Sequence, residues 1–397
     1  MRNEEWETAS DKPFPSPLTH RPLPLSLYIH IPWCVKKCPY CDFNSHEARG
    51  EVPEAEYTAA LLADLEQALP LVWGRKLSSI FFGGGTPSLL SERALDDILG
   101  GVRARLPLVA DAEITLEANP GTFEADKFSA FRAAGVNRLS IGIQSFNPHH
   151  LQALGRIHDD RQARAAVECA RRHFDNINLD LMFALPEQTL AETLQDMSEA
   201  IAFAPQHISA YQLTLEPGTR FHRSPPSLPD ADLAADMQQA VAERLAEGGY
   251  RRYEISAYAS TGRRCLHNLN YWNFGDYLGI GAGAHSKISL PGRIVRQERF
   301  RQPSQYVAQA RQGQAVRDER VLTAADLPFE FMMNALRLTD GFSPPLFEAR
   351  TGLALETVAP ILRQAQARGL LAQDEQQIRP TEKGRDFLND LLQMFLA

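Results

Sequence analysis

Short apolar runs alternate along the first half of the chain with longer segments of helical spacing. The apolar run Leu25–Ile31 precedes a helical pattern over Glu54–Leu69. Apolar runs of this length between helical patterns predict parallel strands joined by helical crossovers. Further strands are expected at Ser78–Phe82, Glu113–Glu117, Arg138–Gln144, Asn176–Phe183 and His207–Leu215, with helices at Ser91–Leu106, Phe123–Ala134, Asp160–Arg172 and Leu190–Phe203.

These six strand–helix units predict an α/β fold, a partial (β/α)6 barrel open on one side, which we place at residues 25–260. In barrels of parallel strands the reactive groups collect at the carboxyl ends of the strands. Residues 1–24 contain five prolines and are expected to form a flexible lead. Residues 261–325 are interpreted as a connecting segment that carries a candidate haem motif.

The pattern changes in the last quarter of the chain, where short helices replace the strand–helix alternation. The helical stretches are expected at 329–338, 344–351, 355–368 and 382–395, with a small hairpin from 370–372 and 377–379. Residues 326–397 therefore predict an α+β domain that resembles a winged helix. Such modules often bind DNA, but we expect this one to cover the barrel instead.

Composition describes an ordinary globular protein, with 44% hydrophobic and 23% charged residues. The net charge of −8 argues against broad nucleic-acid binding. The first residues are acidic and polar, and no apolar stretch is long enough for a membrane span, so we expect neither a secretory signal nor a transmembrane helix. A cytoplasmic location is expected.

Three cysteines with CxxxCxxC spacing follow the first predicted strand, at Cys34, Cys38 and Cys41. Thiolates are the ligands that iron–sulfur centres prefer. Three thiolates bind three irons of a [4Fe–4S] cluster and leave the fourth iron open. The open iron can hold the amino and carboxylate groups of S-adenosylmethionine.

The cysteine run has two alternative interpretations. A structural zinc site normally has four ligands, and only His30 or His46 could add a fourth beside the cysteines. A disulfide is also disfavoured, because the other cysteines, Cys169 and Cys265, are scattered and the total of five is odd.

Polar residues at predicted strand ends are candidates for ligand contact. Gly83–Pro87 follows a strand and could expose backbone groups to a ligand, although a tight turn would explain it equally well. Glu117 and Gln144 end strands. Arg156 could bind a carboxylate or form a structural salt bridge. Asp180 lies in an apolar strand and needs a partner, for which a ribose hydroxyl would serve.

The segment His267–Trp272 combines a histidine with two aromatic rings. Imidazole is a common axial ligand of haem iron, and flat rings can pack on a porphyrin. The competing interpretation is a structural segment with a hydrogen-bonded histidine and buried aromatics. His285, in the glycine-rich stretch Gly279–Ser286, and Cys265 are further candidate haem ligands.

Five segments together resemble the radical S-adenosylmethionine (radical SAM) family of oxygen-independent coproporphyrinogen III oxidases. They are Tyr28–Cys34, Cys38–Phe43, Gly83–Pro87, Ile141–Ser145 and Asp180–Pro186. The resemblance spans roughly residues 25–395, and the cysteine run is its most specific part. It implies a radical SAM barrel whose S-adenosylmethionine site is lined by Tyr28, Gly84, Gly85, Thr86, Glu117, Gln144, Arg156 and Asp180.

Two departures point to the haem-chaperone branch of that family, called HemW. The oxidases carry a further cysteine where this chain has Phe43, and they have a longer N-terminal extension. The branch also has an HNxxYW motif, matched here by His267, Asn268, Tyr271 and Trp272.

The resemblance implies a haem chaperone that binds haem, a [4Fe–4S] cluster and S-adenosylmethionine and delivers haem to apoproteins, which can lie at a membrane surface. The alternative is an enzyme, an oxygen-independent coproporphyrinogen III oxidase acting on porphyrinogen, and a radical enzyme with another substrate is a third hypothesis. An electron donor such as a flavodoxin or ferredoxin is expected in each case.

Overall fold

A computed structural model describes residues 24–122 and 125–396 of the chain. The predicted proline-rich lead therefore lies, except for its last residue, outside the described residues. Within the described ranges, no helix is both long and apolar enough to cross a bilayer.

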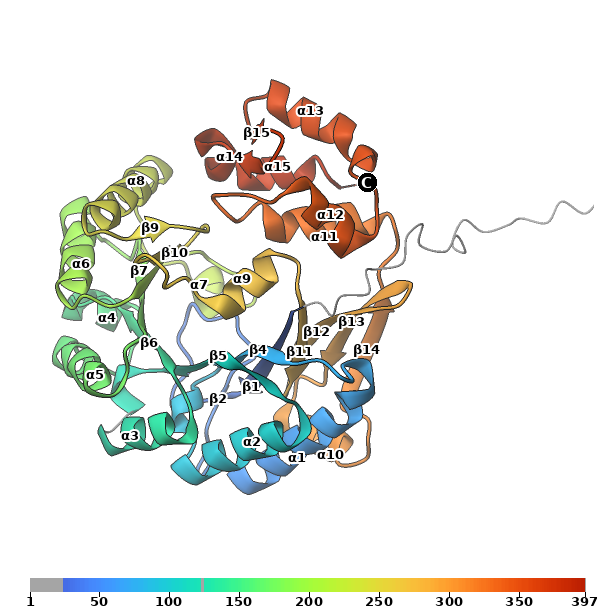
Figure 1. Cartoon of the computed structure of the whole chain (residues 1–397). Helices are drawn as coiled ribbons and strands as arrows, with labels where there is room; N and C mark the ends of the chain where they lie inside the picture. The colour runs from blue at the N-terminus through green and yellow to red at the C-terminus, as the bar shows by residue number, and fades with distance from the viewer. Residues whose placement is uncertain (1–23, 123–124, 397) are drawn as a thin grey trace, which may run out of the picture.

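The centre of the molecule is a curved sheet with six neighbouring parallel strands, in the order β1-β4-β5-β6-β7-β8 (Figure 1). This arrangement confirms the predicted partial barrel. These six strands are β1 (Leu25–Ile31), β4 (Leu77–Gly84), β5 (Leu108–Ala118), β6 (Arg138–Gln144), β7 (Ile177–Phe183) and β8 (His207–Gln212). A seventh strand, β11 (Asp276–Ile280), which the sequence analysis did not predict, pairs in parallel with the other side of β1.

Burial of both faces explains why these segments are nearly continuous apolar runs. In β1 every residue except Tyr28 is buried, and Ile177–Phe183 has the same pattern with Asp180 as its exception. The two exceptions are polar side chains, and both line cavities. The one position in each of these two strands that is not buried is thus a position that lines a cavity.

Helices cover the outer face of the sheet (Figure 1). Polar caps fix the N-termini of several of these helices. Asp159 and Thr189 each form a capping box, and the Ser91 side chain accepts a hydrogen bond from the Ala94 amide. The covering helices are α1 (Glu54–Ala68), α2 (Glu92–Arg105), α3 (Ala125–Ala134), α5 (Asp160–His173), α6 (Leu190–Ala202) and α8 (Ala231–Glu247).

Both edges of the parallel sheet are extended by strands that the sequence analysis did not predict. The segment interpreted as a connection forms four strands that continue the sheet from β1, together with helices α9 (Leu266–Trp272) and α10 (Pro303–Ala310). The added strands are β9 (Arg251–Arg252) and β10 (Ala257–Ala259) beyond β8, and β11 (Asp276–Ile280), β12 (His285–Leu290), β13 (Arg293–Arg299) and β14 (Val316–Val321) beyond β1.

Short elements complete the barrel region. They are β2 (Trp33–Cys34) and β3 (His46–Glu47), which pair with each other around the cysteine run, and helices α4 (Pro148–Ala153) and α7 (Arg220–Arg223).

The C-terminal region has the predicted helices and hairpin and a hydrophobic core of its own. Phe331 lies at the centre of this core, in edge-on contact with Phe342 and Phe347 at ring-centroid distances of 4.9 and 5.1 Å. Its elements are α11 (Asp326–Ala335), α12 (Pro344–Thr351), α13 (Ala359–Ala367), β15 (Leu371–Gln373), β16 (Ile378–Pro380), α14 (Glu382–Asp386) and α15 (Leu388–Gln393).

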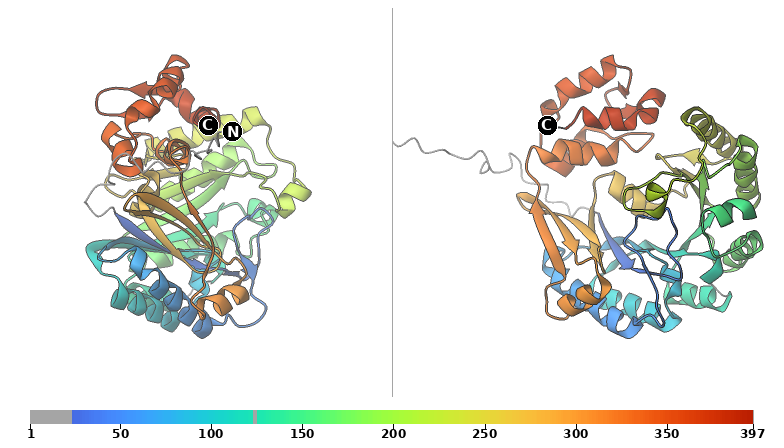
Figure 2. Two further views of the ribbon diagram at one scale, coloured as in Figure 1. Left: turned by 90° about the vertical axis from the view of Figure 1, so that its right-hand side faces the viewer. Right: turned by 180° about the vertical axis from the view of Figure 1, so that it is seen from behind.

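The C-terminal domain lies over the open side of the barrel, as Figures 1 and 2 show. Glu330 on α11 forms an ion pair with Arg296 on β13, beside one edge of the opening. At the other edge the Thr339 amide donates to the Tyr253 carbonyl at 3.0 Å. The domain therefore bridges the two edges, in agreement with the covering role expected from the sequence.

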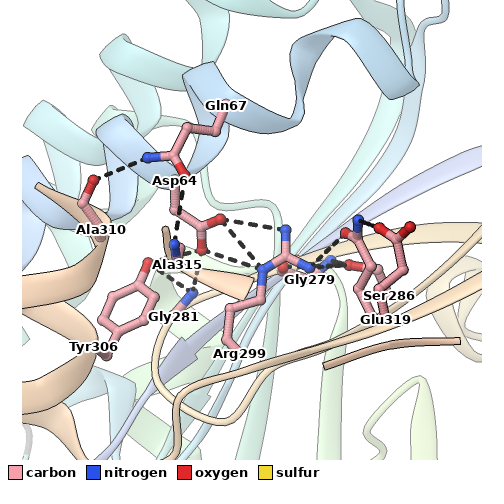
Figure 3. Close-up of polar contacts among 11 residues, drawn as sticks. Asp64, Gln67, Gly279, Gly281, Ser286, Arg299, Tyr306, Ala310, Ala315 and Glu319 are labelled. Atoms are coloured by element: carbon pink, nitrogen blue, oxygen red, sulfur yellow. Dashed lines mark hydrogen bonds and ion pairs between the residues drawn. The ribbon is translucent and has the colours of Figure 1, made fainter. Parts of the chain in front are cut away.

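A fully buried ion pair joins the first helix of the barrel to the added strands (Figure 3). Arg299 on β13 and Asp64 on α1 lie 3.2 Å apart, with side chains that are 0% and 1% exposed. The Tyr306 hydroxyl on α10 donates to the same carboxylate at 2.9 Å. These hydrogen bonds offset part of the cost of burying both charges.

Removing one partner of this pair leaves the other charged and buried. We therefore expect Asp64→Asn to lower the free energy of unfolding by about 3–5 kcal/mol, measured by urea denaturation. Glu56→Gln is the matched control, since Glu56 on the same helix lies 3.7 Å from Arg311 in an exposed pair. The control should lose less than about 1 kcal/mol, and equal losses in both variants would contradict the assignment.

Candidate functional site

The carboxyl ends of the parallel strands enclose a cavity of about 380 Å³. Most of the residues that the sequence analysis selected line it together, although they come from different strand–helix units. They are Cys34, Cys38, Cys41, Gly84, Gly85, Thr86, Glu117, Gln144, Arg156 and Asp180. Tyr28 does not line this cavity, and its position is described below.

The three cysteines of the run are reduced and half-buried. Burial raises the pKa of the Cys34 and Cys41 thiols, while hydrogen bonds from Thr86 and Ser45 act in the opposite direction. The Arg156 guanidinium lies 3.5 Å from the Cys38 sulfur. A cation and hydroxyl donors around the sulfurs are the surroundings that stabilise thiolates, the form that binds iron.

The residues around the cysteine run also bear on the zinc alternative. Among the described residues, no group of three or more His, Cys, Asp or Glu side chains is arranged to hold one metal ion. A mononuclear zinc site made with His30 or His46 therefore has no geometric support. Cys34, Cys38 and Cys41 all line the first cavity, and three thiolates at one cavity fit a cluster, whose irons each take a separate thiolate.

The glycine run after β4 brings its backbone close to the cysteine segment. The Gly85 amide donates to the Ile31 carbonyl at 2.8 Å, and the Thr86 amide donates to the Trp33 carbonyl at 2.7 Å. Gly84 has φ +111°, and a Cβ atom there would lie 2.4 Å from the His30 ring. Only glycine fits this position without strain, so the glycine run can lie in direct contact with the segment that leads into the cysteines.

Two carboxyl groups, Glu117 and Asp180, face the same cavity. Burial, with the nearby Asp180 charge, raises the pKa of Glu117 to about 8, although the Gly84 amide lies 3.3 Å from its oxygen and opposes the shift. Burial also raises the pKa of Asp180, whose oxygens accept hydrogen bonds from Ser140 at 2.7 Å and Asn178 at 2.9 Å. The pair offers hydrogen-bonding oxygens suited to amino or hydroxyl groups.

Arg156 and Gln144 form another part of the wall. Arg156 donates to the Gly142 carbonyl at 2.9 Å and to the Asn119 side chain. Its partners are therefore neutral oxygens and a sulfur rather than a carboxylate, and its charge remains available to an anionic ligand. Gln144 ends β6 with φ +68°, a left-handed conformation that is rare for residues other than glycine.

A second cavity of about 450 Å³ adjoins the first, and Phe43, Gly84 and Glu117 line both. Tyr28 lies here, with its hydroxyl 3.1 Å from His30 Nδ1. Tyr271 and Trp272 of the HNxxYW motif also line this cavity. The Phe43 side chain is 62% exposed, which is unusual for a ring of this size.

The histidine of the motif does not reach either cavity. His267 is 1% exposed, and its Nδ1 and Nε2 atoms lie 2.9 Å from Ser79 Oγ and from the Tyr271 hydroxyl. Burial lowers the pKa of His267 to about 3. Asn268, on the same helix, does not line either cavity.

Several residues that complete the first cavity were missed in the sequence analysis. Ser140 lines it and holds Asp180, and Asn119 lines it and donates to Thr86 at 2.9 Å. Both could have been found, because Ser140 interrupts an apolar strand and Asn119 stands at a strand end before a proline. Tyr211, at the end of β8, gave no such signal.

Comparisons with known proteins identify relatives of this chain. The radical SAM superfamily profile matches residues 28–200, and the HemN C-terminal domain profile matches residues 322–387. The Escherichia coli (strain K12) protein "Heme chaperone HemW" is 51% identical over 376 residues, covering 94% of this chain and 98% of that protein. The Haemophilus influenzae protein of the same name is 46% identical over 380 residues, with the same coverage.

The architecture also matches a solved structure, that of coproporphyrinogen III oxidase (HemN) from Escherichia coli, described as a radical SAM enzyme. The TM-score is 0.81 at 26% sequence identity, over 96% of this chain and 92% of that chain.

The raised pKa of Glu117 predicts how stability depends on pH in the protein without ligands. Its carboxyl has an ordinary pKa of 4.5 and about 8 in the folded state, so folding takes up a proton between these values. Stability should therefore fall as the pH rises through this window. Glu117→Gln removes the titrating group. We therefore expect the free energy of unfolding of the variant, relative to that of the wild type, to rise by roughly 1–4 kcal/mol from the lower to the upper end of this pH window.

Urea denaturation at a series of pH values measures this difference. Glu168→Gln, at an exposed position on α5, serves as the control and should run parallel to the wild type. A Glu117→Gln variant that keeps the full pH dependence of the wild type would show that another group is responsible.

Proposed function

Because this chain belongs to the HemW family of haem chaperones within the radical SAM superfamily, we propose that it binds haem and delivers it to apoproteins. The observation that carries this proposal is the 51% identity to a heme chaperone over nearly the whole of both chains. Phe43 supports it, because the oxidases resembled by the sequence carry a cysteine at this position.

The residues of the first cavity suit the cofactors of the superfamily. Cys34, Cys38 and Cys41 would each supply one thiolate to a [4Fe–4S] cluster, which leaves one iron for S-adenosylmethionine. When bound, the cluster would provide electron transfer to the sulfonium of S-adenosylmethionine.

The surrounding side chains would hold the other parts of S-adenosylmethionine. The backbone of Gly84, Gly85 and Thr86 approaches the cysteine segment and would meet the amino group. Arg156, which has no carboxylate partner among the described residues, would bind the methionine carboxylate. Asp180, fixed by Ser140 and Asn178, would accept hydrogen bonds from the ribose.

The roles of the remaining predicted residues follow from the same geometry. The raised pKa of Glu117 favours its protonated form at neutral pH when no ligand is present. After losing this proton, the carboxylate would accept a hydrogen bond from the amino group of S-adenosylmethionine. Gln144 would contact the nucleoside from the end of β6. Tyr28 lines the second cavity and would contact S-adenosylmethionine from that side rather than from the side of the cluster.

The competing function is oxidation of coproporphyrinogen III, and the likeness to the HemN structure favours it. The two functions differ in what happens to the tetrapyrrole: an oxidase changes its propionate side chains, whereas a chaperone releases it unchanged. We place the protein in the cytoplasm, with a flavodoxin or ferredoxin as electron donor and with haem-receiving apoproteins that include ones at a membrane surface.

A two-part assay separates these functions. Cluster-reconstituted protein is incubated without oxygen with dithionite, S-adenosylmethionine and coproporphyrinogen III, and 5′-deoxyadenosine and protoporphyrinogen are quantified by chromatography. The same protein, loaded with haem, is mixed with a haem-free globin, and transfer is followed by absorbance. We expect haem transfer and an unchanged porphyrinogen. Deoxyadenosine and protoporphyrinogen formed in step over many turnovers would overturn the proposal.

The cluster assignment has its own test. We expect Cys38→Ala to lose the cluster iron and the binding of S-adenosylmethionine, because the open iron is a main contact of that ligand. Cys169→Ala is the matched control, since Cys169 is buried on α5 and should leave iron content unchanged. Iron analysis and equilibrium dialysis measure both quantities, and full iron content in Cys38→Ala would refute the assignment.

A further inference from the structure

The second cavity lies beside the cavity that we propose for the cofactors. Its volume of about 450 Å³ lies in the range of small-molecule sites, roughly 300–1,000 Å³. Tyr271, Trp272 and Tyr277 contribute aromatic rings to its wall, and Phe43 lines both this cavity and the first one. Aromatic surface of this kind suits a flat apolar ligand.

Of the three candidate haem ligands, one faces this cavity with a free imidazole. His285 lines it and is exposed, and neither of its ring nitrogens is hydrogen-bonded to a described residue. His267 is buried with both ring nitrogens engaged. Cys265 is 0% exposed, and its thiol donates to Glu113 at 3.4 Å.

His285 is held on a rigid support. The Gly281 amide lies 3.4 Å from the Asp64 carboxylate of the buried ion pair (Figure 3), and the Arg299 amide donates to the Ala284 carbonyl at 2.9 Å. These contacts fix the loop immediately before His285. A metal ligand placed on such a support needs little reordering when iron binds.

The charges around His285 suit an anionic tetrapyrrole with a metal centre. Partial burial lowers the pKa of His285, and Arg296 and Arg301 lower it further against the opposing effect of Glu298. The neutral imidazole, the form that binds iron, therefore dominates at neutral pH. Arg301 lines the same cavity, and its guanidinium forms no ion pair with any described residue, so it can meet a carboxylate.

We propose that haem binds in the second cavity with the His285 imidazole as its axial ligand. This inference rests on the proposed haem-carrier function and adds the site and the ligand. Arg301 binds a propionate, and the rings of Tyr271, Trp272 and Tyr277 contact the porphyrin. His267 is a positioning residue, which holds the Tyr271 hydroxyl at 2.9 Å and keeps that ring in the wall.

The test is a titration of cluster-loaded protein with haem, followed by the Soret band and by electron paramagnetic resonance of the ferric complex. Even loss of a group that supports a metal ligand costs about 10–100-fold in affinity. We therefore expect His285→Ala to weaken haem binding at least about tenfold and to change the spin state. Added imidazole should restore the wild-type spectrum, because it can occupy the space that the side chain leaves.

Two further variants make the result specific. His267→Gln retains hydrogen-bonding groups in the buried position, and we expect it to keep the wild-type spin state. His149→Ala removes an exposed imidazole on α4 that lines neither cavity, and it should behave as wild type.

The possible outcomes separate a failure of the proposed haem site from a failure of the proposed haem-carrier function. If the wild-type protein binds no haem, the proposed function fails and the inference fails with it. If the wild type binds haem and His285→Ala keeps its affinity and spectrum, only the inference is overturned. The assignment of His285 is also overturned if His267→Gln, rather than His285→Ala, loses the axial ligand of the haem iron and regains the wild-type spectrum when imidazole is added.

Discussion

The constraint on which this structure depends is that six parallel strands leave a barrel open, with two sheet edges to cover. Strands β9 and β10 extend one edge and β11 to β14 extend the other, while the C-terminal domain spans the gap between them. Unpaired strand edges expose backbone groups that promote association. The same additions build the second cavity, because β11, the loop before β12 and helix α11 all contribute to its wall. Elements that close the fold therefore also form part of the wall of the second cavity.

The parallel core was predictable because each of its strands is buried on both faces and appears as an apolar run between helical patterns. Strands β12 to β14 escaped prediction because their environment is mixed. All six residues of β14 are at least partly exposed, and β13 carries Arg293, Arg296 and Arg299 among its seven residues. Arg299 looks like a surface residue in the sequence, but the carboxylate of Asp64, 235 positions away, neutralises its charge, and Ser286 and Gln297 accept further hydrogen bonds from its guanidinium. Pairing over such a distance leaves no local signal.

Ten of the residues that line the first cavity were selected from the sequence, most of them because they stand at strand ends or in a spaced cysteine run. Ser140, Asn119 and Tyr211 were missed. The haem motif was harder to interpret, since a sequence can mark a histidine as unusual without showing where its ring points. His267 points into the protein, between Ser79 and Tyr271, whereas His285 points into open space. Phe43 stands between the two cavities, so that a ligand in either one meets the same ring. Phe43 therefore offers a direct physical connection between the two cavities, which we propose as the cofactor site and the haem site.

The pairing of β1 also affects how the chain folds during synthesis. One side of β1 pairs with β4 soon after both are made, but Leu25 on the other side pairs with Asp276, 251 positions later (276 − 25). At translation rates of about 5–20 residues per second, that edge waits roughly 13–50 s for its partner. During this time an apolar strand edge remains open on the ribosome-bound chain, where it can associate with other nascent chains. General folding chaperones would therefore act on this protein mainly before residue 280 emerges, and slower translation of the middle of the gene would lengthen the exposure.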